Sequence, residues 1–113
     1  MKMNFSELPE FTKEFRQLAK KYKSLPEDLE EFKSVIAVNP SGNSKHFNVI
    51  TNSETMIILK ARFFCRYLKG SSMRIIYTFD RQKNKVEFIE VYFKGVKEKE
   101  DFERIKKYLK NKS

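Results

Sequence analysis

The stretch MIILKARFFCRYLKGSSMRIIYTFDRQKNKVEFIEVYF, residues 56–93, decides the fold of this chain of 113 residues. Three of its segments are rich in β-branched and aromatic residues, as strands are: 56–64, 73–79 and 86–93. Two short links join them, namely residues 65–72, which turn the chain through Gly70, and residues 80–85. Short links favour antiparallel neighbours, because a parallel pair requires a crossover of about a dozen residues or more. The stretch therefore predicts a three-stranded antiparallel meander.

Helical patterns precede this meander. In residues 9–23 apolar side chains recur at helical spacing, and Pro9 suits the first turn of a helix. Ser24 with Glu27 has the spacing of a capping box, which predicts a second helix directly afterwards. The apolar face of that helix would consist of Leu29, Phe32, Val35 and Ile36. Because the link between the two helices is short, they should form an antiparallel hairpin that packs against the sheet.

The remaining segments complete the predicted architecture. Residues 38–54 are rich in Asn, Ser and other turn formers and predict a loop with a short strand at 47–50, while residues 3–5 are a candidate strand. Apolar spacing near the C-terminus predicts a helix over residues 99–110. We expect one α+β domain over residues 1–113: a small antiparallel β-sheet packed against an N-terminal helical hairpin, with a C-terminal helix.

The charge of the chain is concentrated in its second half. Residues 1–54 hold eight basic and eight acidic side chains, whereas residues 55–113 hold sixteen basic and seven acidic ones, so the whole net charge of +9 comes from the second half. A surface of one sign attracts phosphate backbones or acidic proteins. The distribution indicates a polyanionic or acidic partner, and a lysine-rich surface without a specific partner remains the alternative.

Several classes of function find no support in the sequence. The chain has a single histidine, His46, expected on the surface, and a single cysteine, Cys65, expected to be buried and structural. It has no glycine-rich phosphate loop, no zinc-protease motif and no nucleophile elbow. We therefore predict neither a metal site nor a small-molecule cofactor. The absence of a long apolar run predicts a cytoplasmic protein that does not associate with membranes.

Cations on the predicted strands are the strongest candidates for a site. Lys60 and Arg62 are two residues apart, so their side chains should point from the same face of one strand, and Arg74 opens the neighbouring strand. These three cations are expected to converge. Further cations lie near strand ends and would widen the cluster: Arg66, Lys94 and Lys97. The alternative is a solvated basic face that keeps the sheet from aggregating.

The order of these pieces resembles the RelE/ParE superfamily of bacterial and archaeal toxins, over most of the chain from about Phe11 to Leu109. The resemblance rests on the early helical hairpin FTKEFRQLAKKYKSLPEDLEEF, the basic strand LKARF, the turn and strand LKGSSMRIIYTFD, and the late strand and turn IEVYFKGVKEKED. It implies a small antiparallel sheet on a helical pair. In this superfamily the RelE-like branch cleaves mRNA, often in the ribosomal A site, and the ParE-like branch poisons DNA gyrase. A cognate antitoxin protein holds both inactive.

The resemblance also implies a set of site residues. The catalytic cations of the family fall on Lys60, Arg62 and Arg74, and its late-strand cation falls on Lys94 or Lys97. Its C-terminal aromatic residue corresponds to Phe102 or to Tyr108. The RNA supplies its own 2′-hydroxyl as nucleophile, so the protein has to align it and stabilise charge on the phosphate. We expect Arg74 to bind the scissile phosphate with help from Arg62, and Lys60 to act as a base or as an electrostatic anchor.

Three functions therefore remain open at the level of sequence. The first is a RelE-like mRNA endoribonuclease, which makes the best use of the cation set and would have an antitoxin, mRNA and the ribosome as partners. The second is a ParE-like gyrase inhibitor in which the same cations are surface charge. The third is a non-catalytic RNA-binding module that stacks bases on aromatic side chains of the sheet, with three candidates: Tyr77, Tyr92 and Phe64.

Overall fold

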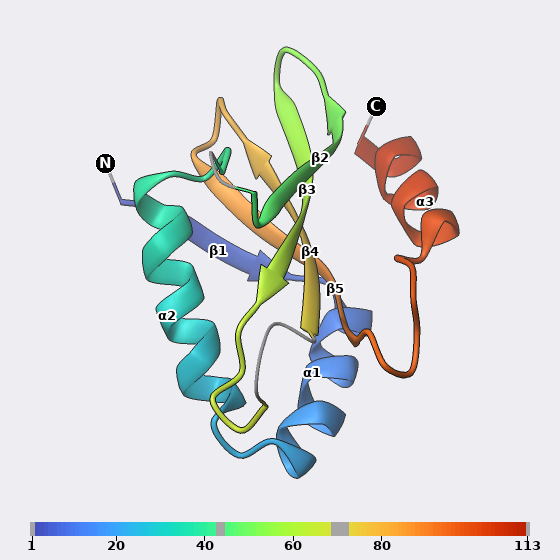
Figure 1. The fold of residues 1–113 in the computed structure, drawn as a ribbon. Coiled ribbons are helices and arrows are strands. Elements are labelled where there is room, and N and C mark those ends of the chain that lie inside the picture. Colours follow the sequence, from blue (N-terminus) through green and yellow to red (C-terminus); the bar gives the residue numbers. More distant parts are fainter. Residues whose placement is uncertain (1, 43–44, 69–72, 113) are drawn as a thin grey trace.

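The structure is a computed structural model that describes residues 2–42, 45–68 and 73–112. Gly70, where the sequence predicts a turn, and residues 43–44 of the predicted loop lie outside the described residues. Eight elements follow one another in the described part of the chain (Figure 1): β1 (Asn4–Glu7), α1 (Pro9–Lys21), α2 (Leu25–Val38), β2 (Phe47–Asn52), β3 (Met56–Phe63), β4 (Met73–Asp80), β5 (Lys85–Phe93) and α3 (Phe102–Lys112).

The strands form one sheet in the order β1-β5-β4-β3-β2. The predicted meander is confirmed, because β3, β4 and β5 pair antiparallel with their neighbours along the chain. The predicted short strand β2 pairs antiparallel with β3. The sheet is not wholly antiparallel, since β1 runs parallel to β5. A strand of four residues carries too little pattern for the sequence to indicate its partner.

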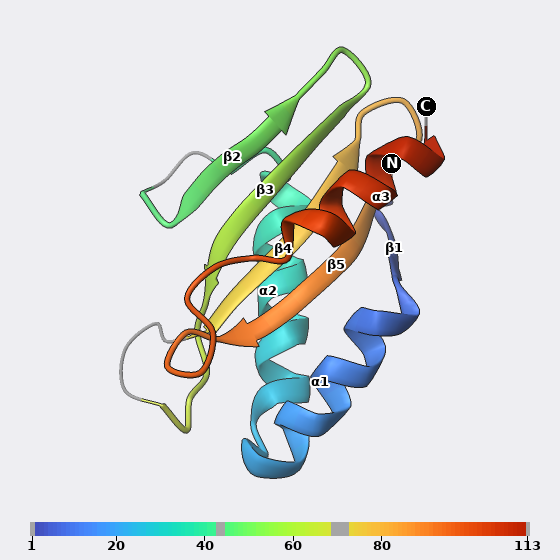
Figure 2. The same ribbon diagram turned by 90° about the vertical axis from the view of Figure 1, so that its right-hand side faces the viewer.

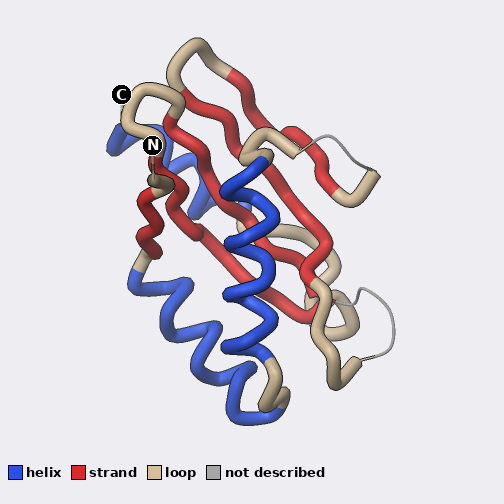
Figure 3. Tube along the Cα trace, turned by 90° about the vertical axis from the view of Figure 1, so that its left-hand side faces the viewer, coloured by secondary structure: helices blue, strands red, loops and turns tan. Residues whose placement is uncertain are grey.

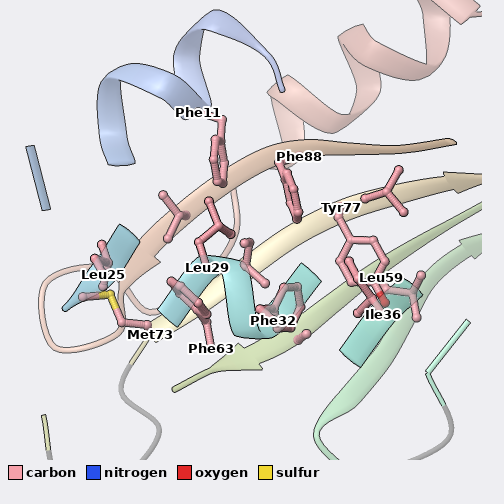
Figure 4. Packing of buried hydrophobic residues seen from close by; sticks show 14 of the residues in the cluster. Phe11, Leu25, Leu29, Phe32, Ile36, Leu59, Phe63, Met73, Tyr77 and Phe88 are labelled. Atoms are coloured by element: carbon pink, nitrogen blue, oxygen red, sulfur yellow. The ribbon is translucent and has the colours of Figure 1, made fainter. Parts of the chain in front are cut away.

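Helices cover the sheet on both faces. α1 and α2 run back along each other on one face (Figure 3), as the hairpin prediction requires. They enclose the main core, in which four aromatic rings surround Phe32, namely those of Phe47, Phe63, Tyr77 and Phe88. The centroids of neighbouring rings in this group are 5.7 to 6.5 Å apart. Figure 4 shows Phe32, Phe63, Tyr77 and Phe88 among aliphatic residues of α2 and β3, namely Leu29, Ile36 and Leu59. The face of the sheet that carries the aromatic residues of this core is therefore turned toward α1 and α2.

The opposite face of the sheet is divided into two halves. α3 lies across β4 and β5 (Figure 2) and buries a second, smaller core that consists of Ile58, Ile76, Ile89, Ile105 and Tyr108. Toward the other ends of the same strands, this face carries polar and cationic residues in place of isoleucines. The fold thus covers one half of the face and leaves the other half for the candidate site.

Two helix starts differ from the prediction. Ser24 has helical backbone angles (φ −80°, ψ −8°) and makes no capping bond to the backbone; its hydroxyl donates instead to Asp28 Oδ2 at 2.7 Å. The capping box at Ser24 and Glu27 is therefore wrong. The C-terminal helix begins at Phe102 rather than near residue 99, because Asp101 Oδ1 accepts a hydrogen bond from the Arg104 amide at 3.0 Å and so starts the helix.

None of the helices in the described residues is long and apolar enough to cross a membrane.

Candidate functional site

The register of the sheet brings three predicted cations to one place. Arg62 on β3 lies directly opposite Arg74 on β4, and Lys60 is two residues from Arg62 along β3. Cross-strand partners and residues two apart share a face of a sheet. Lys60, Arg62 and Arg74 therefore point from the same face, the half that α3 leaves uncovered.

A polar hollow of about 180 Å³ lies over this group of cations. We call it the basic hollow; its lining residues are Lys45, His46, Asn48, Lys60, Ala61, Arg62, Arg74 and Lys94. Five of the eight are cationic and none of these described lining residues is acidic. Like charges this close repel one another unless an anion is present, so the arrangement suits a ligand with concentrated negative charge, such as a phosphate.

Besides Ala61, three lining residues of the basic hollow are not among the predicted site residues. Asn48 pairs with Lys60 across the β2–β3 ladder, and Lys45 and His46 directly precede β2. The sequence did contain a signal for Asn48, because a strand at 47–50 paired with the basic strand places alternate residues beside Lys60 and Arg62. Lys45 and His46 lie in a segment whose composition indicates only a loop.

Lys60 is held at the edge of the basic hollow by an ion pair. Its Nζ lies 3.0 Å from Glu100 Oε1, and the Glu100 side chain is only 6% exposed. This charge-assisted hydrogen bond fixes the position of the Lys60 amino group. Of the two predicted roles of Lys60, base and electrostatic anchor, this contact is the one expected for an anchor.

A second buried carboxylate fixes the segment between β5 and α3. Glu90 has a fully buried side chain that binds the Lys97 ammonium and accepts a hydrogen bond from the Asp101 amide at 2.8 Å. Lys97 also lies over the ring of Tyr92, 5.5 Å from its centroid. The late-strand cation that lines the basic hollow is therefore Lys94, whereas Lys97 ties the segment to the sheet.

Tyr92 is the cross-strand partner of Arg74 and is only 5% exposed. Burial raises the pKa of its phenol to about 12, with a further contribution from the charges of Glu100 and Glu90 that outweighs the opposite effect of Arg74. No described residue makes a hydrogen bond to its Oη. Tyr92 thus remains neutral beside the cations at physiological pH.

The structure does not bring the other predicted binding residues to the basic hollow. Arg66 lies among three carboxylates of α2, with ion-pair distances of 3.1 Å to Glu27, 3.4 Å to Asp28 and 2.6 Å to Glu31, and hydrogen bonding to Glu31 is the main cause of its raised pKa. It fastens the end of β3 to α2. Arg66 is therefore engaged in the packing of the fold.

The two candidate C-terminal aromatic residues also lie away from the basic hollow. Phe102 begins α3 and is half exposed. Tyr108 lies in the second core, where its hydroxyl donates to Glu87 Oε1 at 2.7 Å and burial is the main cause of its raised pKa. Neither residue is among the described residues that line the basic hollow.

The aromatic candidates for base stacking differ in their exposure. Tyr77 is fully buried and its hydroxyl donates to the Pro40 carbonyl at 2.8 Å, and Tyr92 is buried as described above. Phe64, directly after β3, is 53% exposed, and its ring meets that of His46 edge to face with centroids 5.3 Å apart. Only Phe64 of these three presents a ring to solvent.

The fold of the chain is that of RelE. A chain of the archaeal RelE–RelB complex from Pyrococcus horikoshii OT3 has a TM-score of 0.64 and 14% identity, covering 84% of this chain and 98% of that one. A mutant of the E. coli toxin RelE in the free state has a TM-score of 0.56 and 19% identity, covering 87% of this chain and 90% of that one. No family model matches the sequence, and no curated protein is significantly similar to it.

Proposed function

We propose that this chain, which has the RelE fold, is the toxin of a toxin–antitoxin pair and that it cleaves mRNA. The observation that carries the proposal is the basic hollow, in which Arg62 and Arg74 stand directly opposite each other on the uncovered half of the sheet. Guanidinium groups bind phosphate oxygens well, because their planar fork offers two donors at once and stays charged.

In the proposed reaction the 2′-hydroxyl of the RNA attacks the adjacent phosphorus. The bond from phosphorus to the 5′-oxygen of the next nucleotide breaks, which leaves a 2′,3′-cyclic phosphate and a free 5′-hydroxyl. The proton of the 2′-hydroxyl passes to a base, and the departing 5′-oxygen receives one. Arg74 and Arg62 would stabilise the negative charge that grows on the phosphate oxygens, an effect worth about 100-fold or more in rate for a single donor.

The proposal gives different roles to the other residues of the basic hollow. Lys60, held by Glu100, acts as an electrostatic anchor for the phosphate chain, and Lys94 extends the positive surface along the RNA. We assign to His46 the role of accepting the proton of the 2′-hydroxyl, because it lines the basic hollow and histidine is the most common general base in enzymes.

The proposed partners follow from the same surface. The RelE of the archaeal structure is in complex with RelB, and for this chain we propose a cognate antitoxin that places acidic side chains over the basic hollow. Translated mRNA, read on the ribosome, is the proposed substrate, and the cytoplasm is the proposed place of action.

The decisive experiment compares wild type with Arg74→Ala and Arg16→Ala during induced expression in a bacterial host. Arg16 is an exposed arginine on α1, on the opposite side of the sheet from the basic hollow, so Arg16→Ala removes the same charge without touching the site. We expect wild type and Arg16→Ala to arrest growth and to create new RNA 5′ ends in translated messages. Arg74→Ala should be folded and do neither.

Two other outcomes would favour the alternatives. Growth arrest without new RNA ends would support a ParE-like inhibitor of gyrase. Continued growth with folded, abundant wild-type protein would support a non-catalytic RNA-binding module. Cleavage by a folded Arg74→Ala variant would overturn the role of Arg74.

A further inference from the structure

An apolar groove of about 250 Å³ adjoins the basic hollow where β3 ends. Its walls come from α2, the start of β2 and the end of β3, and its apolar lining residues are Phe32, Val35, Phe47, Phe63 and Phe64. Arg62 and His46 line both the groove and the basic hollow. The two depressions are therefore neighbours that share a wall.

Phe64 gives this groove an exposed aromatic surface. Phe63 ends β3 with its side chain 1% exposed, whereas Phe64 projects outward and is 53% exposed. His46 meets the Phe64 ring edge to face, which keeps the two rings nearly perpendicular at 88°. Exposing a phenylalanine gives up hydrophobic stabilisation, and an aromatic ring fixed at a groove presents a flat apolar face to a ligand.

The charged residues of the groove favour one orientation of a bound nucleotide, with its phosphate toward the basic hollow and its base in the groove. Arg62 is at the end shared with the basic hollow, while Asp28 and Glu31 line the groove from α2. Both carboxylates are paired with Arg66, and the acceptor sites that remain on Glu31 can take hydrogen bonds from the N–H groups of a base. A nucleotide whose phosphate lies in the basic hollow would therefore direct its base into the groove.

We propose that the groove binds an unpaired base of single-stranded RNA, stacked on Phe64, next to the phosphate that the basic hollow holds. This subsite rests on the proposed function, because it requires RNA in the basic hollow. Neither Phe102 nor Tyr108 is among the described residues that line the groove or the basic hollow, so Phe64 supplies the aromatic contact there.

The test uses purified protein and two fluorescent probes of about six nucleotides, a length within the range of single-strand sites. One probe is an unstructured RNA whose 2′-hydroxyls are methylated, so that it cannot be cleaved. The other has the same sugar–phosphate chain without bases. Binding is followed by fluorescence anisotropy for wild type, Phe64→Ala, Phe64→Tyr, Arg74→Ala and Tyr67→Ala. Tyr67 is an exposed aromatic residue, 62% accessible, outside the groove lining, and is the matched control.

Loss of one stacked base should weaken binding by about 10-fold. We expect Phe64→Ala to lose this factor on the RNA probe and to bind the baseless probe as wild type does. Phe64→Tyr should restore the affinity, Tyr67→Ala should have no effect, and Arg74→Ala should weaken binding to both probes.

The remaining outcomes overturn the subsite in distinguishable ways. Wild-type affinity of Phe64→Ala for the RNA probe, together with loss of binding in Arg74→Ala, would remove the base subsite and leave the proposed function standing. Equal weakening of both probes by Phe64→Ala would show that Phe64 acts through the shape of the basic hollow. Failure of wild type to bind either probe would remove the subsite and the RNA-binding step of the proposed function together.

Discussion

At the scale of the residue, the site depends on where single charged and phenolic groups are buried. Glu90 on β5 and Glu100 in the segment between β5 and α3 are two buried carboxylates, and each holds a lysine. Tyr92 lies against the same carboxylates and beside Arg74. Because the phenol is neutral, Tyr92 adds no negative charge next to Arg74. This favours the binding of an anionic ligand at Arg74.

The raised pKa of Tyr92 makes stability depend on alkaline pH. The phenol ionises at about pH 10 in an unfolded chain and at about 12 in the folded protein, so its contribution is complete below about pH 10 and is lost as the pH rises toward 12. Tyr92→Phe cannot ionise in either state. We predict that raising the pH lowers the free energy of unfolding, measured with urea, less in Tyr92→Phe than in wild type. The difference should reach about 1 kcal/mol at about pH 11.

The control for this measurement is Tyr67→Phe, in which an exposed tyrosine is changed. Lysines also titrate in this range, but they do so equally in all three proteins. Parallel curves for wild type and Tyr92→Phe between about pH 9 and 11 would contradict the assigned cause.

At the scale of the element, α3 determines which half of the sheet face is open. It is attached by its apolar side to Ile58, Ile76 and Ile89 and by Arg104 to α1. Arg104 forms two hydrogen bonds with Glu14 of α1, at 2.9 and 2.7 Å, and a third with the Ile89 carbonyl at 2.9 Å. Both partners of the ion pair are largely buried, with 15% and 27% of their side chains exposed.

We predict that Arg104→Met destabilises the protein by about 2 kcal/mol, because it leaves the partly buried carboxylate of Glu14 without its charged donor. Amide hydrogen exchange should accelerate in α3 more than in the meander. The matched control is Lys106→Met on the same helix, whose ion pair with Glu103 is exposed (74% and 87%) and should contribute little. Equal protection of α3 in the Arg104→Met variant and wild type would refute the anchoring role of Arg104.

At the scale of the whole molecule, the excess charge is directed to one surface. Several basic side chains of the second half are paired locally with carboxylates, among them Lys60, Arg66, Lys97 and Arg104. The basic hollow also gathers Lys45, Arg62, Arg74 and Lys94, and its described lining has no acidic residue.

This concentration predicts the salt dependence of RNA binding under the proposed function. Each phosphate neutralised by the protein contributes about −0.7 to the slope of log K against log salt for a single strand. Arg74→Ala should make the slope shallower by about this amount, measured with the uncleavable RNA probe. Arg16→Ala removes a charge on the far side of the sheet and should keep the wild-type slope. Identical slopes in all three proteins would show that RNA binds elsewhere.

The helical and strand periodicities were sufficient to predict much of the architecture. The alternation in residues 56–64 correctly placed Lys60 and Arg62 on one face, and the helical spacing in residues 9–23 predicted α1. The sequence did not predict that β1 joins β5 in parallel or that Ser24 bonds to Asp28 rather than to the backbone. These features depend on partners that are distant in sequence or on competing side-chain contacts.

The sequence by itself determined the meander, the helical hairpin and the common face of Lys60 and Arg62, because these follow from local periods of 2.0 and 3.6 residues, whereas the register of β3 and β4 places Arg74 on that face. Only the tertiary structure decided that Lys94 and not Lys97 lines the basic hollow and that Arg66 and Tyr108 are used in packing. It also decided that Phe64 lines an apolar groove next to the basic hollow. The physical reason is that each of these choices depends on which buried carboxylate or apolar face a side chain meets across the fold, and sequence spacing does not encode that contact.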